Sequence, residues 1–156
     1  MTTAHLDHAK HNHKLADQLF KEGEFMDWAL TVAYYASINY VKHHIFPLPD
    51  HGLSHLGEPI KSFDDYCTYF KPADRHAALC DLFMNKCNKN IGISLRTLMN
   101  DCKTARYNDY MIESARVRAA MSTLKSVEKI CISKRVADPN KKQKRPRIQK
   151  AIVVRK

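Results

Sequence analysis

The sequence predicts an all-α fold: an antiparallel bundle of four to five helices that is followed by a basic tail. Apolar residues recur at spacings of three and four along several long stretches, which is the period of a helix with one buried face. No stretch before the last few residues alternates apolar and polar side chains with the period of two that strands require. Residues 1–133 are therefore expected to form a helical bundle domain, and residues 134–156 a flexible basic tail.

The bundle is expected to be organised around residues 26–46, which contain neither Gly nor Pro and mix aromatic side chains with Ala and Ser. A helix that is apolar on nearly all sides is normally covered by its neighbours, so residues 28–41 are expected to be the most buried segment. The stretch is long enough to span a bilayer, but Asp27, Asn39 and Lys42 make that placement costly. We therefore expect no membrane contact.

Local signals place the ends of the other helices. Gly23 follows the first of them as a C-terminal cap, and Ser62 with Asp65 forms a capping-box pattern at the start of a short helix. Asp109 suits the N-cap of the last helix. Residues 47–59 hold three of the six prolines and two of the four glycines, so a loop is expected there. The longer helices are expected over about residues 5–22, 73–88, 91–107 and 109–133.

The positive charge is concentrated at one end of the chain. The formal net charge is +10, yet residues 1–133 carry 16 Lys and Arg against 15 Asp and Glu, whereas residues 134–156 carry 10 against one. A cluster of like charges without aromatic residues is suited to sequence-independent contact with a phosphate backbone. We therefore expect the tail to bind nucleic acid, although an acidic protein partner would satisfy the same charges. The tail residues expected to contact phosphates are Lys141, Lys142, Lys144, Arg145, Arg147 and Lys150.

Cysteines and histidines predict neither a disulfide framework nor a metal site. The five cysteines are an odd number and none forms a C-x-x-C pair, so they are expected to be reduced thiols within the core. His5, His8 and His11 share one helix face, but no Cys or carboxylate completes a site from the same helix. No basic region followed by an apolar run opens the chain. We expect no metal and no cofactor, and a cytoplasmic location.

Three pieces of the sequence, in this order, resemble one family. The first is His-Asn-His-Lys-Leu-Ala-Asp-Gln-Leu at residues 11–19, the second comprises Asp-Trp-Ala at 27–29 and Tyr-Tyr-Ala-Ser-Ile-Asn-Tyr-Val at 34–41, and the third is Ala-Arg-Tyr at 105–107. Together they are similar to the small stand-alone members of the HEPN superfamily, the higher eukaryote and prokaryote nucleotide-binding helical bundles. The resemblance covers roughly residues 5–133. It implies a four- or five-helix bundle that usually pairs as a homodimer.

Many members of that superfamily are metal-independent ribonucleases that act as toxins or defence effectors through an Arg followed four to six residues later by His. This chain departs from that pattern, because its last histidine is His76 and Arg75 immediately precedes it. Cleavage of RNA by its own 2′-hydroxyl needs a proton acceptor near neutral pH and a cation for the developing phosphorane charge. The chain has both residue types without the usual spacing, so we expect a non-catalytic, dimerising bundle that binds nucleic acid, RNA in preference to DNA.

Two alternatives to that function stay open at this point. One is a ribonuclease of a defence system with a non-standard site built from Arg75, His76 and Arg106, with Arg96 joining them across a dimer. The other is a protein adaptor whose tail binds an acidic partner. Arg106 and Tyr107 themselves permit two interpretations: Arg106 satisfies the last carbonyls of its helix while Tyr107 packs on the first helix, or the pair contacts a phosphate or a base.

Overall fold

The computed structural model of the chain describes residues 4–48, 59–108 and 111–133, and in these ranges the fold is all-α, as predicted. An isolated antiparallel bridge joins Leu48 to Ile60. None of the helices in the described ranges combines the length and apolarity that crossing a bilayer requires. The helices are α1 (Ala4–Glu22), α2 (Met26–Ile45), α3 (Phe63–Phe70), α4 (Arg75–Lys86), α5 (Lys89–Tyr107) and α6 (Ser114–Ser133).

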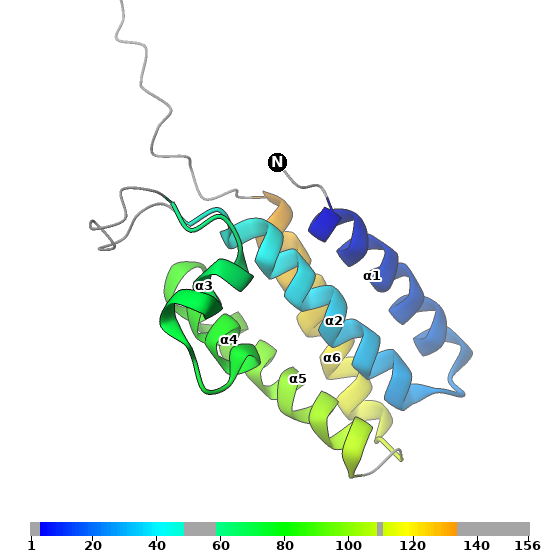
Figure 1. Cartoon of the computed structure of the whole chain (residues 1–156). Coiled ribbons are helices and arrows are strands. Elements are labelled where there is room, and N and C mark those ends of the chain that lie inside the picture. The colour runs from blue at the N-terminus through cyan, green and yellow to red at the C-terminus, as the bar shows by residue number, and fades with distance from the viewer. Residues whose placement is uncertain (1–3, 49–58, 109–110, 134–156) are drawn as a thin grey trace, which may run out of the picture.

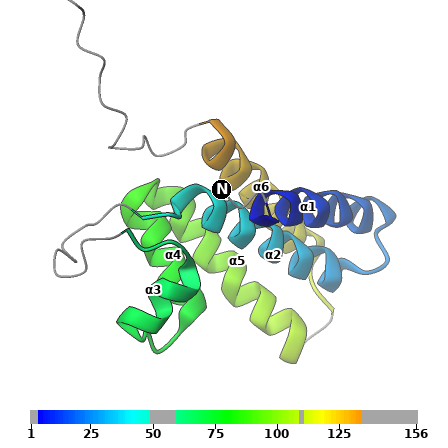
Figure 2. The same cartoon turned by 45° about the horizontal axis from the view of Figure 1, so that its top comes forward.

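Helix α2 lies at the centre of the bundle and contacts α1, α4, α5 and α6. Figure 1 shows α1 on one side of α2, α4 and α5 on the other side, and α6 behind α2, with the short α3 beside α4. The same arrangement is visible after the rotation in Figure 2. Close packing on several sides is possible because Ala29, Ala33, Ala36 and Ser37 are fully buried and their side chains are short.

The prediction that residues 28–41 form the most buried segment is right from Ala29 onward and wrong for Trp28. The Trp28 side chain is 58% exposed, whereas Tyr34 and Tyr40 are 3% and 0% exposed. Trp28 precedes Tyr35 by two helical turns and shares its face, and Tyr35 is paired with the last turn of α5. Helix α5 runs opposite to α2 (Figure 1) and ends at Tyr107, so among the described residues no helix covers Trp28.

The predicted caps of the first and third helices are confirmed. The Gly23 amide donates to the Leu19 carbonyl at 3.1 Å, and Gly23 has a φ of 77°, a left-handed conformation that glycine adopts without steric cost. The Ser62 hydroxyl accepts from the Asp65 amide at 3.1 Å and donates to the Asp65 carboxylate at 2.8 Å. This reciprocal pairing starts α3 where the capping-box pattern predicted a helix.

Three helix starts differ from the expected ones. Helix α5 begins at Lys89, two residues earlier than expected. Helix α4 begins at Arg75 because the Asp74 carboxylate accepts hydrogen bonds from the amides of His76 and Ala77, at 2.9 and 3.0 Å. Helix α6 begins at Ser114, later than residue 109, and Asp109, its expected N-cap, lies outside the described residues.

A buried polar group fastens α2 to α1 and α6. The Tyr40 hydroxyl donates to Glu128 at 3.1 Å and accepts from Nδ1 of His13 at 3.3 Å. Because the phenol proton is given to Glu128, the ring proton of His13 must sit on Nδ1. The imidazole Nδ1 is also 3.5 Å from the second oxygen of Glu128. The Tyr40 hydroxyl, Nδ1 of His13 and the Glu128 carboxylate therefore have partners inside the bundle.

Candidate functional site

The six tail cations expected to contact nucleic acid lie outside the described residues. The candidate site in the described part of the chain is therefore built from the other predicted residues, Arg75, His76, Arg106 and Tyr107, and from the side chains that hold them.

Arg106 is held between two tyrosines at the end of α5. Its guanidinium donates to the Tyr35 hydroxyl at 2.7 Å, and its central carbon is 5.0 Å from the centroid of the Tyr107 ring. Among the described residues no carboxylate forms an ion pair with Arg106. The guanidinium is thus oriented by aromatic side chains and its charge is not neutralised by an acidic neighbour.

Tyr107 is 72% exposed, so the interpretation that places it against the first helix is wrong. The reason is that Tyr107 is the last residue of α5 and its neighbour is the guanidinium of Arg106, not another helix. Three more large apolar side chains are exposed where α2 begins and beyond the end of α5. They are Phe25 (47%), Trp28 (58%) and Met111 (72%).

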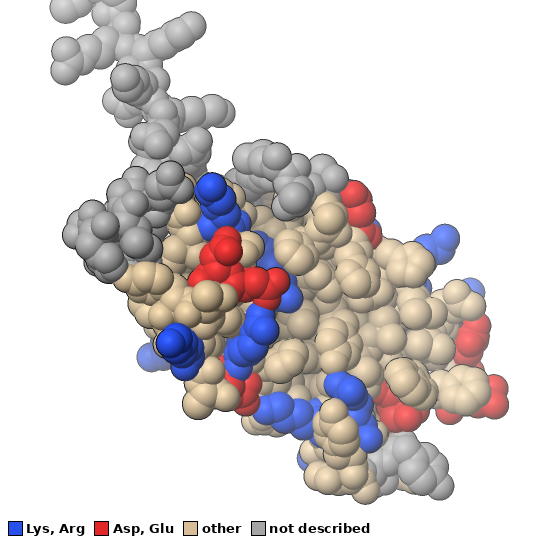
Figure 3. Space-filling view, in the orientation of Figure 1, with Lys and Arg blue, Asp and Glu red and all other residues tan. Residues whose placement is uncertain are grey.

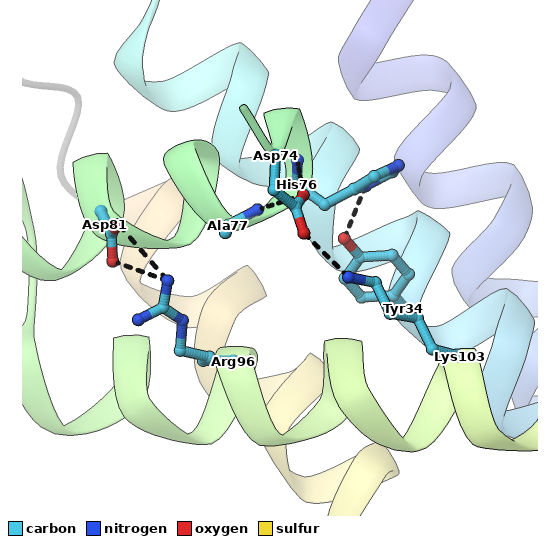
Figure 4. Close-up of polar contacts among 7 residues, drawn as sticks. All are labelled: Tyr34, Asp74, His76, Ala77, Asp81, Arg96 and Lys103. Carbon is cyan, nitrogen blue, oxygen red and sulfur yellow. Dashed lines mark hydrogen bonds and ion pairs between the residues drawn. The ribbon is translucent and has the colours of Figure 1, made fainter. Parts of the chain in front are cut away.

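His76 is bonded to Tyr34 of the central helix. The Tyr34 oxygen is 2.7 Å from Nδ1 of His76 (Figure 4). Burial raises the pKa of Tyr34 far above its usual value, so the phenol keeps its proton at all ordinary pH values. Among the described residues that proton has no acceptor other than Nδ1, which leaves the ring proton of neutral His76 on Nε2.

The pKa of His76 lies below its usual value. Burial is the main cause, and the nearby cations Lys103, Lys42 and Arg75 act in the same direction, while Asp74 opposes them. His76 is therefore a neutral ring near pH 7. In this tautomer Nε2 is a hydrogen-bond donor and carries no lone pair for accepting a proton.

Two of the three candidate catalytic residues belong to one connected group. The rings of Tyr34 and Tyr35 are neighbours, with centroids 5.6 Å apart. His76 therefore stands at one end, and Arg106 at the other end, of a line of side chains that runs from α4 through α2 to α5. Sequence spacing alone does not predict this line, because it depends on how α4 and α5 sit on α2.

Arg75 and Arg96 are not part of this group. Arg75 forms an ion pair with Asp64 of α3 and lies 5.8 Å from the centroid of the Phe63 ring. Arg96 pairs with Asp81 of α4 at 3.3 Å. Both arginines therefore form ion pairs that join two helices of the same chain. Figure 4 shows the Arg96–Asp81 pair apart from Tyr34 and His76.

Sequence analysis missed Lys103, which positions the start of α4. Its ammonium donates to Asp74 at 2.9 Å, and this hydrogen bond, with those from the Ala77 and His76 amides, lowers the pKa of Asp74 to about 2. Lys103 precedes Arg106 by three residues, so the two share a face of α5. The three-residue spacing of these two cations is the sequence signal that could have identified Lys103.

A cavity of about 490 Å³ opens beside His76, between α2, α3 and α4. Sequence analysis also missed Lys42 as a residue of this cavity; its ammonium lies 5.5 Å from the centroid of the Phe63 ring. On the surface over α3, α4 and α5, basic and acidic side chains are interleaved (Figure 3). The residues that line the cavity are Ile38, Lys42, Phe63, Ala73, Asp74, Arg75, His76 and Leu79.

The N-terminal histidines are engaged separately. His5 pairs with Asn39 at 3.2 Å and His13 with Tyr40 at 3.3 Å, on different turns of α1. Nowhere in residues 4–48, 59–108 and 111–133 do three or more His, Cys, Asp or Glu side chains gather as metal ligands would. The five cysteines are free thiols, and four of them are buried.

Comparisons with known proteins add no relative: no model of a protein family, no curated protein and no solved structure matches this chain. The resemblance to the HEPN superfamily therefore stays a prediction that rests on the residues quoted for it.

Proposed function

We propose that this chain is a HEPN-like bundle that binds nucleic acid without cleaving it, as a homodimer and with RNA preferred to DNA. The observation that carries the proposal is the end of α5, where the guanidinium of Arg106 is oriented by Tyr35 and lies over Tyr107. A cation beside an exposed aromatic ring can contact a phosphate and stack on a base at the same time.

The neighbouring aromatics extend this surface. Trp28, in the first turn of α2, and Tyr107, the last residue of α5, are 58% and 72% exposed. The start of α2 and the end of α5 lie at the same end of the bundle (Figure 1). Stacking on exposed rings favours single strands, whose bases are accessible, and RNA is recognised in this way more often than duplex DNA. The cations of residues 134–156, which have a net charge of +9, would supply the phosphate contacts that give affinity. The exposed rings at the end of α5 would supply contacts to bases.

The state of His76 favours binding over catalysis. A ribonuclease needs an imidazole nitrogen that accepts the proton of the 2′-hydroxyl. In this chain Nδ1 of His76 is paired with the buried Tyr34 hydroxyl, and the tautomer inferred from that pairing carries its proton on Nε2. His76 is therefore arranged to donate a hydrogen bond, which suits holding an anion and not activating a nucleophile.

Fluorescence anisotropy of a labelled oligouridine, titrated with the full-length protein at several salt concentrations, tests the proposal. Tyr107→Ala should weaken binding about tenfold, since stacking of one base contributes on the order of 1–3 kcal/mol. Tyr69→Ala is the matched control, because Tyr69 is an exposed tyrosine of α3. Equal affinity of both variants would refute a role for the α5 end.

The tail is tested separately in the full-length chain. Changing Lys141, Lys142, Lys144, Arg145 and Arg147 to Gln should flatten the plot of log affinity against log salt. The slope should fall by about 0.7 for each phosphate of a single strand that the tail no longer neutralises. An unchanged slope would assign the tail to an acidic protein partner instead.

One observation supports the ribonuclease alternative: the line of side chains that connects His76 to Arg106 through two tyrosines. If this group cleaves RNA, His76→Gln and Arg106→Gln should each abolish product formation on a gel while affinity changes little. The proposed function instead requires that the unmodified protein leaves the oligouridine intact over hours.

A further inference from the structure

The cavity between α2, α3 and α4 is separate from the Arg106 end of the bundle, and we infer that it binds the phosphate group of a small phosphate monoester. The Lys42 side chain, which borders the cavity, is partly buried on α2, and among the described residues no carboxylate forms an ion pair with it. A half-buried ammonium without a counter-ion is costly, and an anion in the adjacent cavity would remove that cost.

The other charges around the cavity are already matched. Asp64 pairs with Arg75, and Asp74 pairs with Lys103 while it accepts from two backbone amides. Among the described residues, Lys42 is therefore the cation of the cavity that has no carboxylate in an ion pair with it. Burial lowers the pKa of Lys42; the nearby Asp64 acts against burial, and Arg75, with which Asp64 is paired, acts in the same direction as burial.

His76 adds a donor of the right kind. Because the Tyr34 hydroxyl occupies Nδ1, the ring presents N–H at Nε2, which points away from Tyr34 in Figure 4. His76 lines the cavity together with Lys42 and Arg75. Of the polar groups that line the cavity, Arg75 is paired with Asp64 and Asp74 with Lys103, so Lys42 and the Nε2–H of His76 are the donors left for a ligand. A phosphate oxygen accepts from such donors, but a cation does not.

The walls indicate that the phosphate belongs to an organic molecule. Ile38, Phe63 and Leu79 supply apolar surface, and a volume of about 490 Å³ exceeds what one inorganic ion fills. Cavities of roughly 300–1,000 Å³ with apolar walls and a few polar groups are typical of small-molecule sites. The ester group would pack on the Phe63 ring while its phosphate meets Lys42.

Isothermal titration calorimetry with phenyl phosphate tests the inference. The protein is the full-length chain in which the five tail cations named above are changed to Gln, so that the tail does not bind the anion. Saturable binding at one site per chain is expected, and inorganic phosphate should bind about tenfold more weakly because it buries no ring. Binding that does not saturate, or equal affinity for both, would overturn the inference.

Lys42→Met removes the charge but keeps an unbranched apolar side chain over Phe63. It should weaken phenyl phosphate binding about tenfold or more, as expected for a lost charge-assisted hydrogen bond. Lys86→Met, at the exposed far end of α4, is the matched control and should bind as before. Lys42→Arg should retain affinity. If the Met variants behave alike, Lys42 does not bind the phosphate.

A second measurement does not depend on any variant. Bound phosphate should raise the pKa of His76, which faces Lys42 from α2, Asp74 and Arg75 from the start of α4, and Lys103 from α5. Two-dimensional NMR of the imidazole follows this pKa with and without phenyl phosphate, and no change on saturation would contradict the inference.

The source of the phosphate is then identified with two RNA strands that differ only in a 5′-phosphate or 5′-hydroxyl. Tighter binding of the phosphorylated strand that is lost in Lys42→Met would show that the end of a nucleic acid occupies the cavity. Equal binding of both strands, with saturable phenyl phosphate, would show that the site takes a free small molecule. Failure of phenyl phosphate binding with intact RNA binding would refute this inference and leave the proposed function standing.

Discussion

Helix α2 carries two tyrosine–histidine pairs on opposite sides, and they have opposite hydrogen-bond polarity. Tyr40 gives its proton to Glu128 and receives one from His13, so that group is closed inside the bundle. Tyr34 gives its proton to His76, whose Nε2–H is left for another partner beside a cavity. The same two residue types therefore hold helices together on one side of α2 and present a donor on the other.

The difference comes from what surrounds each pair. A carboxylate beside Tyr40 takes the phenol proton and fixes the histidine as a donor to the phenol. Beside Tyr34 no carboxylate of the described residues competes, and the neighbouring acidic residue, Asp74, is used by amides and Lys103. A single acidic residue thus decides whether a buried Tyr–His pair is closed or open.

Gly92→Ala is expected to have the largest effect on the unfolding free energy, and it should disturb the His76 side of α2 but not the His13 side. A Cβ at Gly92 would collide with Cγ of Met84 and lie 2.9 Å from its Cα, so α4 and α5 must move apart. Overpacking of this kind costs about 1–3 kcal/mol of unfolding free energy. Urea unfolding should report this loss, and NMR shifts should change at His76 but not at His13. Equal changes at both histidines would mean that the two sides are not independent.

Tyr40→Phe should cost about 2 kcal/mol of unfolding free energy, because it removes the donor to Glu128 and the acceptor for His13 inside the bundle. Tyr34→Phe is the matched variant and should cost less than about 1 kcal/mol, because water can replace the phenol at the partly exposed His76. Urea unfolding of both proteins makes the comparison. A larger loss for Tyr34→Phe would reverse the assignment of the closed and open sides.

Asp74→Asn is expected to have a smaller effect, about 1 kcal/mol, through the lost negative charge at the N-terminus of α4 and the lost ion pair with Lys103. The pKa of Asp74 is lowered from 3.8 to about 2 in the folded protein, so its contribution is fully present above pH 4 and is lost as the pH falls toward 2. The stabilities of the two proteins should therefore converge near pH 2. A constant difference across this range would show that the carboxylate charge is not involved.

The helices and their buried faces could be predicted from the sequence, and much of the open side of α2 could not. Ala9, His13 and Ala16, the buried residues of α1, are four and three residues apart, and this local periodicity in the sequence indicates the buried face of the helix. Trp28 was misjudged because its exposure depends on where a distant helix, α5, ends. Exposure of that kind is not encoded in the local pattern of α2.

The arrangement of the candidate site also could not be predicted from local sequence patterns. His76 and Arg106 were identified from chemistry and resemblance, but their connection depends on the packing of α4 and α5 against α2. Lys42 drew attention only as an obstacle to membrane insertion, since a lysine near the end of a helix is usually solvated. Its position beside the cavity follows from α3 and Phe63, which fold back onto α2 from the far side of residues 47–59.

The smallest expected effect is the contribution of His76, on the open side of α2, to the pH dependence of the unfolding free energy. The pKa of His76 lies below its usual value of 6.5 in the folded chain, mainly through burial, so the unfolded chain binds more protons between the two values. Folding stability should therefore decline as the pH falls through 6.5 and level off below the folded pKa. His76→Gln keeps a donor at the cavity and should remove this part of the decline in the unfolding free energy, measured by urea unfolding between about pH 8 and pH 5.

The control for that measurement is His8→Gln on the exposed face of α1, which should leave the pH profile of the unfolding free energy unchanged. The profile also bears on the cavity. Saturating phenyl phosphate should reverse the sign of the His76 contribution, because an anion beside the ring favours its charged form and raises the folded pKa above that of the unfolded chain. If the ligand stabilises the protein equally at about pH 5 and pH 8, His76 does not face the bound anion, and the difference between the two tyrosine–histidine pairs is structural only.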